Sequence, residues 1–408
     1  MTELELQPAN YAFGGAVVAH DNNSRPIFVQ GALPGETVRA ALTVDKERYA
    51  HAYVTAVIEP SPERVAPQCR HFGPCGGCAY QHIAYPEQLR AKRLVVADQL
   101  QRIGGLKGIE ILPVIPSPEQ WEYAHEAVFS PTAVGGLGYW SPRRHEVMPI
   151  EFCSITRSRI MTLFNDIDLD LPELRKLTLR LDSEEEILAA LEVEDVEPPE
   201  LEADFPVSVA IVLPDKTAAS LIGDHYLLFQ VKARTFRVSP GCFFQPNLPM
   251  AAKLVDTLLD FAALTGKERV LELYSGVGML TAFLAQEALE VTAVEVNSDA
   301  VADLAVNLDD LDNVALYHGL VEEVLPLIAD RPDLLVVDPG RTGLANPVID
   351  QIKNLTPLRL IYIGSDLART ARDSKALSEV GYILEKVQPL DMRPQTYQVD
   401  ILTLWKAS

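Results

Sequence analysis

An alternation of helical and strand-like segments, beginning near residue 248, constrains the fold of this chain more than any other feature. The segment 248–264 has the apolar spacing of an amphipathic helix. Short apolar runs of strand length follow it, at 270–273, 291–294, 334–337 and 360–363. Strands that alternate with helices of this length build a parallel sheet with helices on both faces. The sequence therefore predicts an α/β fold in which residues 241–408 form a doubly wound, Rossmann-like domain.

Polar residues stand at the ends of these predicted strands, namely Tyr274, Glu295, Asp338 and Ser365. Ligands of an open parallel sheet bind beyond the carboxyl ends of its strands. Gly276 and Gly278 follow the first strand and let the backbone approach a ligand closely. At the end of the second strand, a carboxylate accepts hydrogen bonds from the hydroxyls of a ribose. The G-x-G spacing favours S-adenosylmethionine over a dinucleotide; the alternative is a purely structural role for these residues.

Three cysteines lie close together in the sequence, at Cys69, Cys75 and Cys78. Gly76 and Gly77 between the last two allow the loop to wrap closely around a metal centre. Cys153 is the candidate for a fourth ligand, from a distant segment. Four thiolates suit a structural zinc ion or an iron–sulfur cluster, and ordinary buried cysteines are the remaining alternative. We expect Cys242, which has no partner at a useful spacing, to be a small core residue.

Residues 1–59 have the pattern of a small β-barrel. Short apolar-alternating runs are separated by turn sequences such as Leu33-Pro34-Gly35, and strands at this spacing close into barrels. A linker follows at Pro60-Ser61-Pro62. Residues 60–240 form the predicted central domain, with mixed strands from 110 onward. That domain also contains a helix from about residue 86, whose polar face is predicted to carry Arg90, Lys92, Arg93 and Arg102.

The chain has 408 residues, of which 35 are basic and 57 acidic, for a formal net charge of −22. This excludes a globally basic nucleic-acid binder but not a local basic groove. No apolar run approaches the roughly 18 residues of a membrane span. The N-terminus also lacks the basic and apolar regions of a signal peptide. We therefore expect a cytoplasmic protein, in which clustered cysteines favour metal ligands over disulfides.

Together these motifs resemble the RNA (uracil-5)-methyltransferase family, whose members methylate C5 of uridine in ribosomal and transfer RNA. AFGGAVVAH and VQGALPGETV resemble its TRAM domain, an OB-like RNA-binding barrel. PQCRHFGPCGGCAYQHI resembles the family's [4Fe-4S] segment, which implies the ligands Cys69, Cys75, Cys78 and Cys153. RVSPGCFFQPN, LELYSGVGMLT, AVEVN and VVDPGRTG resemble its ligand-binding motifs. The resemblance implies S-adenosyl-L-methionine as cofactor, bound by Gln245, Tyr274, Gly276, Gly278, Glu295 and Asp338.

The resemblance fails at the two positions that carry the family's chemistry. There, a cysteine in a Ser-Cys-Asn-Pro motif attacks C6 of uracil, and a glutamate of the C-terminal motif assists removal of the C5 proton. In this chain Ser365 stands at the cysteine position and Asp400 at the glutamate position. A serine hydroxyl is far less acidic than a thiol and needs a general base to attack. Aspartate is shorter than glutamate by roughly 1 Å, a misplacement that can cost about 100-fold in rate.

The sequence leaves three hypotheses for function. The first is an active methyltransferase that uses S-adenosylmethionine on rRNA or tRNA, with altered catalytic residues. The second is a catalytically impaired relative that binds RNA or acts as a partner subunit. The third is a binding module whose cluster and cofactor pocket are relics. The intact cofactor motifs argue against the third, and the sequence leaves the oligomeric state open.

Overall fold

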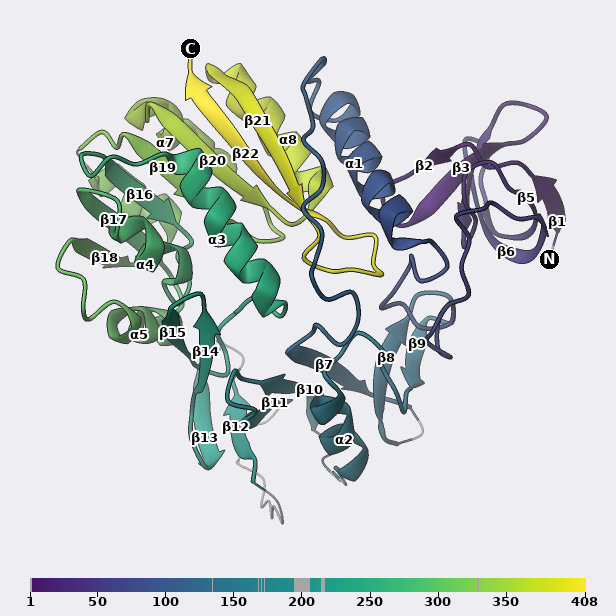
Figure 1. Ribbon diagram of the computed structural model, residues 1–408, viewed down its shortest axis with the longest axis horizontal. Coiled ribbons are helices and arrows are strands. Elements are labelled where there is room, and N and C mark those ends of the chain that lie inside the picture. The colour runs from purple at the N-terminus through teal and green to yellow at the C-terminus, as the bar shows by residue number, and fades with distance from the viewer. Residues whose placement is uncertain are drawn as a thin grey trace.

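The computed structural model describes residues 2–408 apart from 134, 168, 170, 172, 194–205, 214–216 and 329. Its strands form an N-terminal sheet, a central sheet and a C-terminal sheet, with a short hairpin between the last two (Figure 1). Among the helices of the described residues, none is long and apolar enough to cross a membrane.

The N-terminal sheet has the strand order β1-β5-β6-β4-β3-β2. On β4, Ile27 and Val29 are fully buried while Phe28 between them is partly exposed, as in a strand with one face on a core. The apolar runs predicted as strands in this segment are confirmed as β3 to β6. The strands are β1 (Glu3–Leu6), β2 (Asn10–Tyr11), β3 (Ala16–His20), β4 (Pro26–Gln30), β5 (Thr37–Asp45) and β6 (Ala50–Glu59).

The central sheet has the order β13-β12-β11-β10-β7-β8-β9. Helix α2 (Ser158–Asp166) packs on β10, and its Ile160 is fully buried in the core of this sheet. The strands are β7 (Glu126–Pro131), β8 (Leu137–Ser141), β9 (Glu146–Pro149), β10 (Leu174–Leu181), β11 (Ile187–Val193), β12 (Ser208–Val212) and β13 (Ala218–Ile222). The hairpin of β14 (Leu227–Val231) and β15 (Arg234–Val238) follows.

The C-terminal sheet has the order β18-β17-β16-β19-β20-β22-β21, parallel from β18 to β20. The predicted parallel sheet is therefore confirmed, and an antiparallel pair at its edge adds to it. The strands are β16 (Arg269–Leu273), β17 (Glu290–Glu295), β18 (Val314–His318), β19 (Leu334–Val337), β20 (Arg359–Gly364), β21 (Tyr382–Leu390) and β22 (Asp400–Ala407). The helices are α3 (Leu248–Ala262), α4 (Met279–Ala285), α5 (Ser298–Asn307), α6 (Val321–Val324), η1 (Leu325–Leu327), α7 (Asn346–Leu355) and α8 (Leu367–Glu379).

Helix α1 (Tyr85–Arg102) begins and ends within a residue or two of the prediction, with Pro86 in its first turn. It lies between the N-terminal sheet and the yellow strands β21 and β22, in contact with α8 and β21 (Figure 1). The prediction that Lys92 lies on its exposed polar face is wrong. The Lys92 side chain is fully buried, because the loop after β21 covers that side of the helix and pairs with it.

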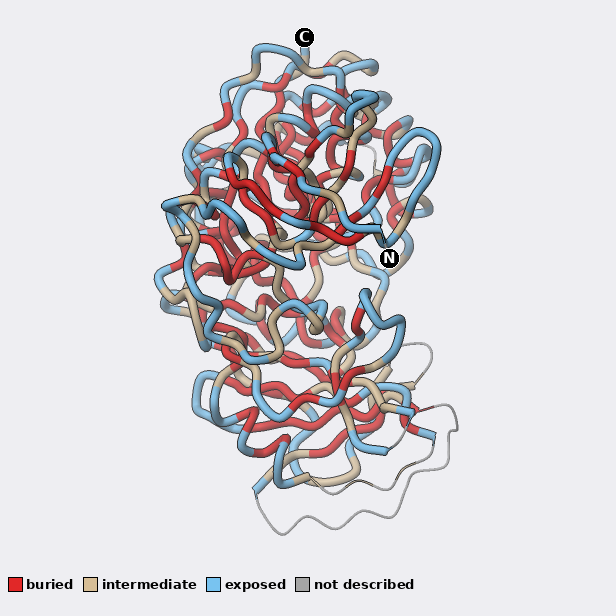
Figure 2. The backbone as a smooth tube through the Cα atoms, turned by 90° about the vertical axis from the view of Figure 1, so that its right-hand side faces the viewer, coloured by how far each residue is buried: buried red, intermediate tan, exposed pale blue. Residues whose placement is uncertain are grey.

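Buried segments continue through the molecule from the part that holds both termini to the central sheet (Figure 2). One apolar cluster joins the N-terminal sheet, α1 and one face of the C-terminal sheet. A second joins the other face of that sheet to α3 and the β14–β15 hairpin. These two cores fix α1 and the loop after β21 against the carboxyl ends of the parallel strands.

Candidate cofactor and catalytic site

The glycine turn after β16 has the backbone geometry that its sequence predicts. Tyr274, Gly276 and Gly278 all have positive φ, at 64°, 55° and 84°, so the chain reverses sharply before α4. A Cβ on Gly278 would lie 2.8 Å from Cγ of Leu304, so a larger residue does not fit there. A Cβ on Gly276 would meet nothing within 4 Å, and the turn is therefore open above that residue.

The parallel register brings three predicted residues to one edge of the sheet. Leu273 pairs with Val294 and with Val337, so the residues that follow them lie side by side: Tyr274, Glu295 and Asp338. The Glu295 carboxylate accepts hydrogen bonds from the backbone N–H groups of Gly276, Val296 and Asn297, each at 2.8 Å. The edge therefore holds a fixed acceptor beside the open turn, with part of its lone-pair capacity still available.

Glu272, within strand β16, was not predicted as a site residue. It is 2% exposed, and burial together with the charges of Asp338 and Glu295 raises its pKa to about 8. The sequence does contain a signal for Glu272: it is an acidic residue inside an otherwise apolar strand, four residues before the first glycine of the turn. A buried carboxyl with a strongly shifted pKa is typical of functional sites.

The buried side-chain oxygens of Gln245 and Ser275 have no hydrogen-bond partner among the described residues, whereas the buried Thr281 hydroxyl lies close enough to Glu272 to oppose the rise in its pKa. Buried polar atoms without partners are costly and rare in native proteins. Gln245 lies between β15 and α3, in a loop that Asn247 ties to Met392 by a 3.1 Å hydrogen bond. The unpartnered oxygens and the open glycine turn fit a polar adenosyl ligand such as S-adenosylmethionine.

The antiparallel pairing of β20 with β22 brings together the two residues that the sequence analysis predicts at the family's cysteine and glutamate positions. Gly364 pairs with Ile401, so Ser365, which follows β20, stands opposite Asp400, which begins β22. Asp400 is 5% exposed, and burial raises its pKa in spite of the nearby Arg393 and Lys92. Burial and the negative charge of Asp400 together raise the pKa of Asp338 to about 7.

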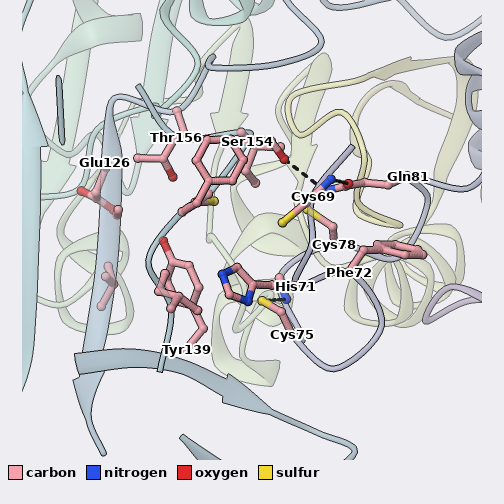
Figure 3. Close-up of a pocket in the computed structure, with 18 residues that line it drawn as sticks. Cys69, His71, Phe72, Cys75, Cys78, Gln81, Glu126, Tyr139, Ser154 and Thr156 are labelled. Atoms are coloured by element: carbon pink, nitrogen blue, oxygen red, sulfur yellow. Dashed lines mark hydrogen bonds between the residues drawn. The ribbon is translucent and has the colours of Figure 1, made fainter. Parts of the chain in front are cut away.

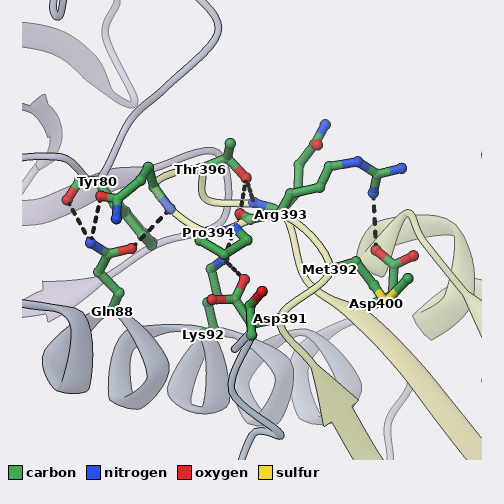
Figure 4. Close-up of polar contacts among 12 residues, drawn as sticks. Tyr80, Gln88, Lys92, Asp391, Met392, Arg393, Pro394, Thr396 and Asp400 are labelled. Carbon is green, nitrogen blue, oxygen red and sulfur yellow. Dashed lines mark hydrogen bonds and ion pairs between the residues drawn. The ribbon is translucent and has the colours of Figure 1, made fainter. Parts of the chain in front are cut away.

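A polar network supports the loop that precedes Asp400 (Figure 4). Arg393 donates from Nη1 to Asp400 at 3.1 Å. Lys92 of α1 pairs with Asp391 and donates to the carbonyl of Arg393 at 3.0 Å. Neither Arg393 nor Asp391 was predicted as a site residue. Asp391 pairs with Lys92, which lies 299 positions earlier, and Arg393 pairs with Asp400 across a loop. No local sequence pattern encodes such pairs.

No base is hydrogen-bonded to Ser365 among the described residues. Within the described part of the chain, its hydroxyl makes no hydrogen bond. Asp366, adjacent in sequence, instead caps helix α8 by accepting from the N–H of Arg369 at 3.0 Å. Cys242 is 3% exposed, and burial with the nearby Asp303 carboxylate raises the pKa of its thiol. It is a core residue, as predicted, and an unactivated thiol.

The four clustered cysteines all line one cavity of about 220 Å³, between the loop after β6 and the central sheet: Cys69, Cys75, Cys78 and Cys153. Figure 3 shows the first three on the loop side, opposite Tyr139 of β8. Gln81 accepts from the N–H of Cys69 at 3.0 Å and so holds the loop. A Cβ on Gly76 would lie 2.4 Å from Pro142 and 2.8 Å from the carbonyl oxygen of Trp140, so only glycine fits.

The donor set of this cavity fits an inorganic centre with sulfur ligands. Within the described ranges, no three His, Cys, Asp or Glu side chains meet around one point that a metal ion could occupy. A tetrahedral zinc ion draws its thiolates in to about 2.3 Å. Four thiols spread around a cavity of about 220 Å³ leave room for a larger inorganic centre held by sulfur ligands.

Comparisons with known proteins agree with this geometry. The family described as tRNA (Uracil-5-)-methyltransferase matches residues 222–401, and the TRAM domain matches residues 9–55. An uncharacterized RNA methyltransferase of Thermosynechococcus vestitus is 32% identical, with 94% of each chain aligned. One of Halalkalibacterium halodurans is also 32% identical, over 92% of this chain and 90% of that one. The structure of Pyrococcus abyssi tRNA (uracil-54, C5)-methyltransferase with S-adenosyl-L-homocysteine has 22% identity and a TM-score of 0.73. It covers 99% of this chain and 100% of its own.

Proposed function

We propose, since the chain belongs to the tRNA (uracil-5-)-methyltransferase family and carries its TRAM domain, that it transfers the methyl group of S-adenosylmethionine to RNA. The observation that carries this proposal is the edge of the C-terminal sheet. There Tyr274, Glu295 and Asp338 lie side by side next to an open glycine turn and unpartnered buried oxygens.

The cofactor would be held by residues on neighbouring strand ends. Glu295 has acceptor capacity for the ribose, Gly276 and Gly278 let the backbone approach, and the Gln245 oxygen lacks a partner. Tyr274 and Asp338 flank the turn on the same edge. When bound, S-adenosylmethionine supplies an electrophilic methyl group on a sulfonium. The protein's part is to orient that methyl group toward an acceptor and to exclude water.

The substrate is RNA, and transfer RNA and ribosomal RNA are the candidates. The TRAM match over residues 9–55 supports this proposal, as do the relatives described as RNA methyltransferases. The Pyrococcus abyssi protein of similar fold acts on a uracil of tRNA according to its description, which favours a transfer RNA as the first substrate to test.

A [4Fe-4S] cluster held by Cys69, Cys75, Cys78 and Cys153 completes the proposal. The cavity that these four thiols line supports it, because its volume and its sulfur donors suit such a cluster. The test is anaerobic purification followed by iron and sulfide analysis and visible absorbance. Cys75→Ser should lose the colour and the iron, whereas Cys242→Ser, a buried cysteine outside the cavity, should keep both. A colourless protein with one zinc per chain would refute the assignment.

Ser365 at the nucleophile position and Asp400 at the base position are the catalytic candidates that the resemblance to the family motifs implies. A catalytically impaired relative, which binds RNA or serves a partner subunit, is the second candidate function. Two observations favour it: the Ser365 hydroxyl has no hydrogen bond among the described residues, and Asp400 is already paired with Arg393 at 3.1 Å. Both weaken the residues on which uridine C5 chemistry depends.

The deciding experiment mixes anaerobically purified protein with unmodified tRNA and rRNA transcripts and S-adenosylmethionine labelled in its methyl group. We expect label in the RNA, with a large loss in Glu295→Gln because the variant weakens the ribose acceptor. Glu287→Gln, a similar change at an exposed residue far from the edge, should behave as the parent. Cofactor binding without transfer to any transcript would favour the impaired relative.

A further inference from the structure

Methyl transfer to C5 of uracil needs a covalent nucleophile, because that ring carbon attacks a sulfonium methyl group only after a nucleophile has added to C6. In this chain the residue at the meeting point of β20 and β22 is Ser365, a weakly acidic hydroxyl with no hydrogen-bonded base among the described residues. The adjacent Asp366 is engaged as the cap of α8.

No cysteine of the chain replaces Ser365 as the nucleophile. Four of them line the cavity between the loop after β6 and the central sheet. The fifth, Cys242, is buried beside Asp303, and its thiol stays protonated. The site therefore holds the residues expected around a cofactor but no activated nucleophile to start carbon chemistry.

The site does hold carboxylates at the ends of two strands that flank β20. Asp338 follows β19 and is partly exposed at the cofactor edge, whereas Asp400 begins β22 and is buried. Arg393 donates a hydrogen bond to Asp400 at 3.1 Å and offsets the negative charge of its carboxylate. Asp338 is thus the more exposed of the two carboxylates. Burial and the charge of Asp400 raise its pKa to about 7, against the backbone N–H of Gly340 and the charge of Arg393, and this pKa suits a group that takes up a proton at neutral pH.

Resting on the proposed function, we propose that the methyl acceptor of this site is a ring nitrogen that carries an imino proton, in a uracil or guanine of the RNA, with Asp338 as the general base. The nitrogen lone pair attacks the methyl carbon, and the carbon–sulfur bond breaks. Its electron pair stays on sulfur, which leaves as S-adenosylhomocysteine. The imino proton passes to the Asp338 carboxylate and then to water, so the reaction needs no covalent intermediate and no further reactant.

An imino nitrogen is favoured over a ribose hydroxyl on acidity. A ring imino proton is considerably more acidic than a ribose hydroxyl, so a carboxylate with a near-neutral pKa removes the first more readily than the second. Asp400 does not compete for the proton, because its carboxylate is buried and paired with Arg393. The position of Asp338 beside Tyr274 and Glu295 puts the base next to the methyl donor's predicted place.

The test uses the full chain, unmodified RNA transcripts and S-adenosylmethionine with a deuterated methyl group, followed by digestion to nucleosides and mass spectrometry. The expected product carries the label on a ring nitrogen. Label on C5 of uridine would overturn the inference while leaving the proposed function intact, and label on a ribose oxygen would do the same. No label in any transcript would overturn the proposed function and this inference with it.

Two further measurements isolate the role of Asp338. At saturating cofactor, Asp338→Asn should slow nitrogen methylation about 100-fold or more, the typical contribution of a general base. Asp312→Asn, a matched change at an exposed residue outside the site, should not. An undiminished rate in Asp338→Asn would overturn the assignment. Independently of any variant, RNA containing 5-fluorouridine should form no denaturant-stable adduct with the parent protein, and such an adduct would also overturn it.

Discussion

Replacement of Lys92 by methionine should strongly destabilise the C-terminal part of the protein. The Lys92 and Asp391 side chains are both fully buried, and Lys92 also donates to the carbonyl of Arg393 at 3.0 Å. Removing the ammonium group leaves Asp391 as a buried charge without its counter-ion, which costs about 3–5 kcal/mol in the free energy of unfolding. A domain of this size is stable by about 5–15 kcal/mol, so the loss is a large fraction of the total.

The assay is urea and thermal unfolding followed by tryptophan fluorescence. Trp405 is fully buried on β22, the strand that begins at Asp400, so it reports on the affected region. At about 2–4 °C for each kcal/mol, Lys92→Met should lower the melting temperature by roughly 6–20 °C. Arg90→Met on the same helix is the matched control, because Arg90 is 61% exposed and its ion pair should contribute less than about 1 kcal/mol.

A double variant separates the buried charge from simple packing. Lys92→Met combined with Asp391→Leu replaces the pair by apolar groups, and such replacements are often neutral or stabilising. We expect the double variant to recover most of the stability that the single variant loses. A single variant within about 1 kcal/mol of the parent, or a double variant no better than the single, would refute the reasoning.

Three further predictions concern stability and the cofactor turn. The pKa of Glu272 is raised to about 8 from 4.5, so folding favours its protonated form and stability should fall as pH rises between those values. Urea unfolding at both ends of that window should show this fall in the parent and a smaller one in Glu272→Gln; equal falls would contradict the assignment. Arg64→Ala removes the ion-pair partner of the fully buried Glu36 carboxylate. It should destabilise the N-terminal sheet by about 3 kcal/mol, measured by thermal unfolding. Gly278→Ala should weaken S-adenosylhomocysteine binding in calorimetry, because φ is 84° there and the new methyl group would lie 2.8 Å from Leu304; unchanged affinity would count against the turn as the cofactor site.

Much of the fold could be predicted because local patterns encode it. Apolar periodicity located the strands and helices from residue 248 onward, and their alternation implied the parallel sheet. The order of strands then brings Tyr274, Glu295 and Asp338 to one edge, as predicted for residues at the carboxyl ends of parallel strands. The resemblance to family motifs supplied the identity of the cofactor and of the cluster, which no pattern of polar residues specifies alone.

Only the tertiary structure decided which charged groups meet. Lys92 occupies a polar position in a helical pattern and was predicted to be exposed. The apolar periodicity of a helix predicts only one buried face, but α1 is covered on two sides. Its partner Asp391 lies 299 positions away, where no local signal links them. The hydrogen bond from Arg393 to Asp400, and the lack of a hydrogen-bonded base at Ser365 among the described residues, likewise follow from how a loop closes over the strand ends. Sequence fixes which groups a site contains, whereas their protonation and reactivity depend on burial and on partners that only the folded chain brings within reach.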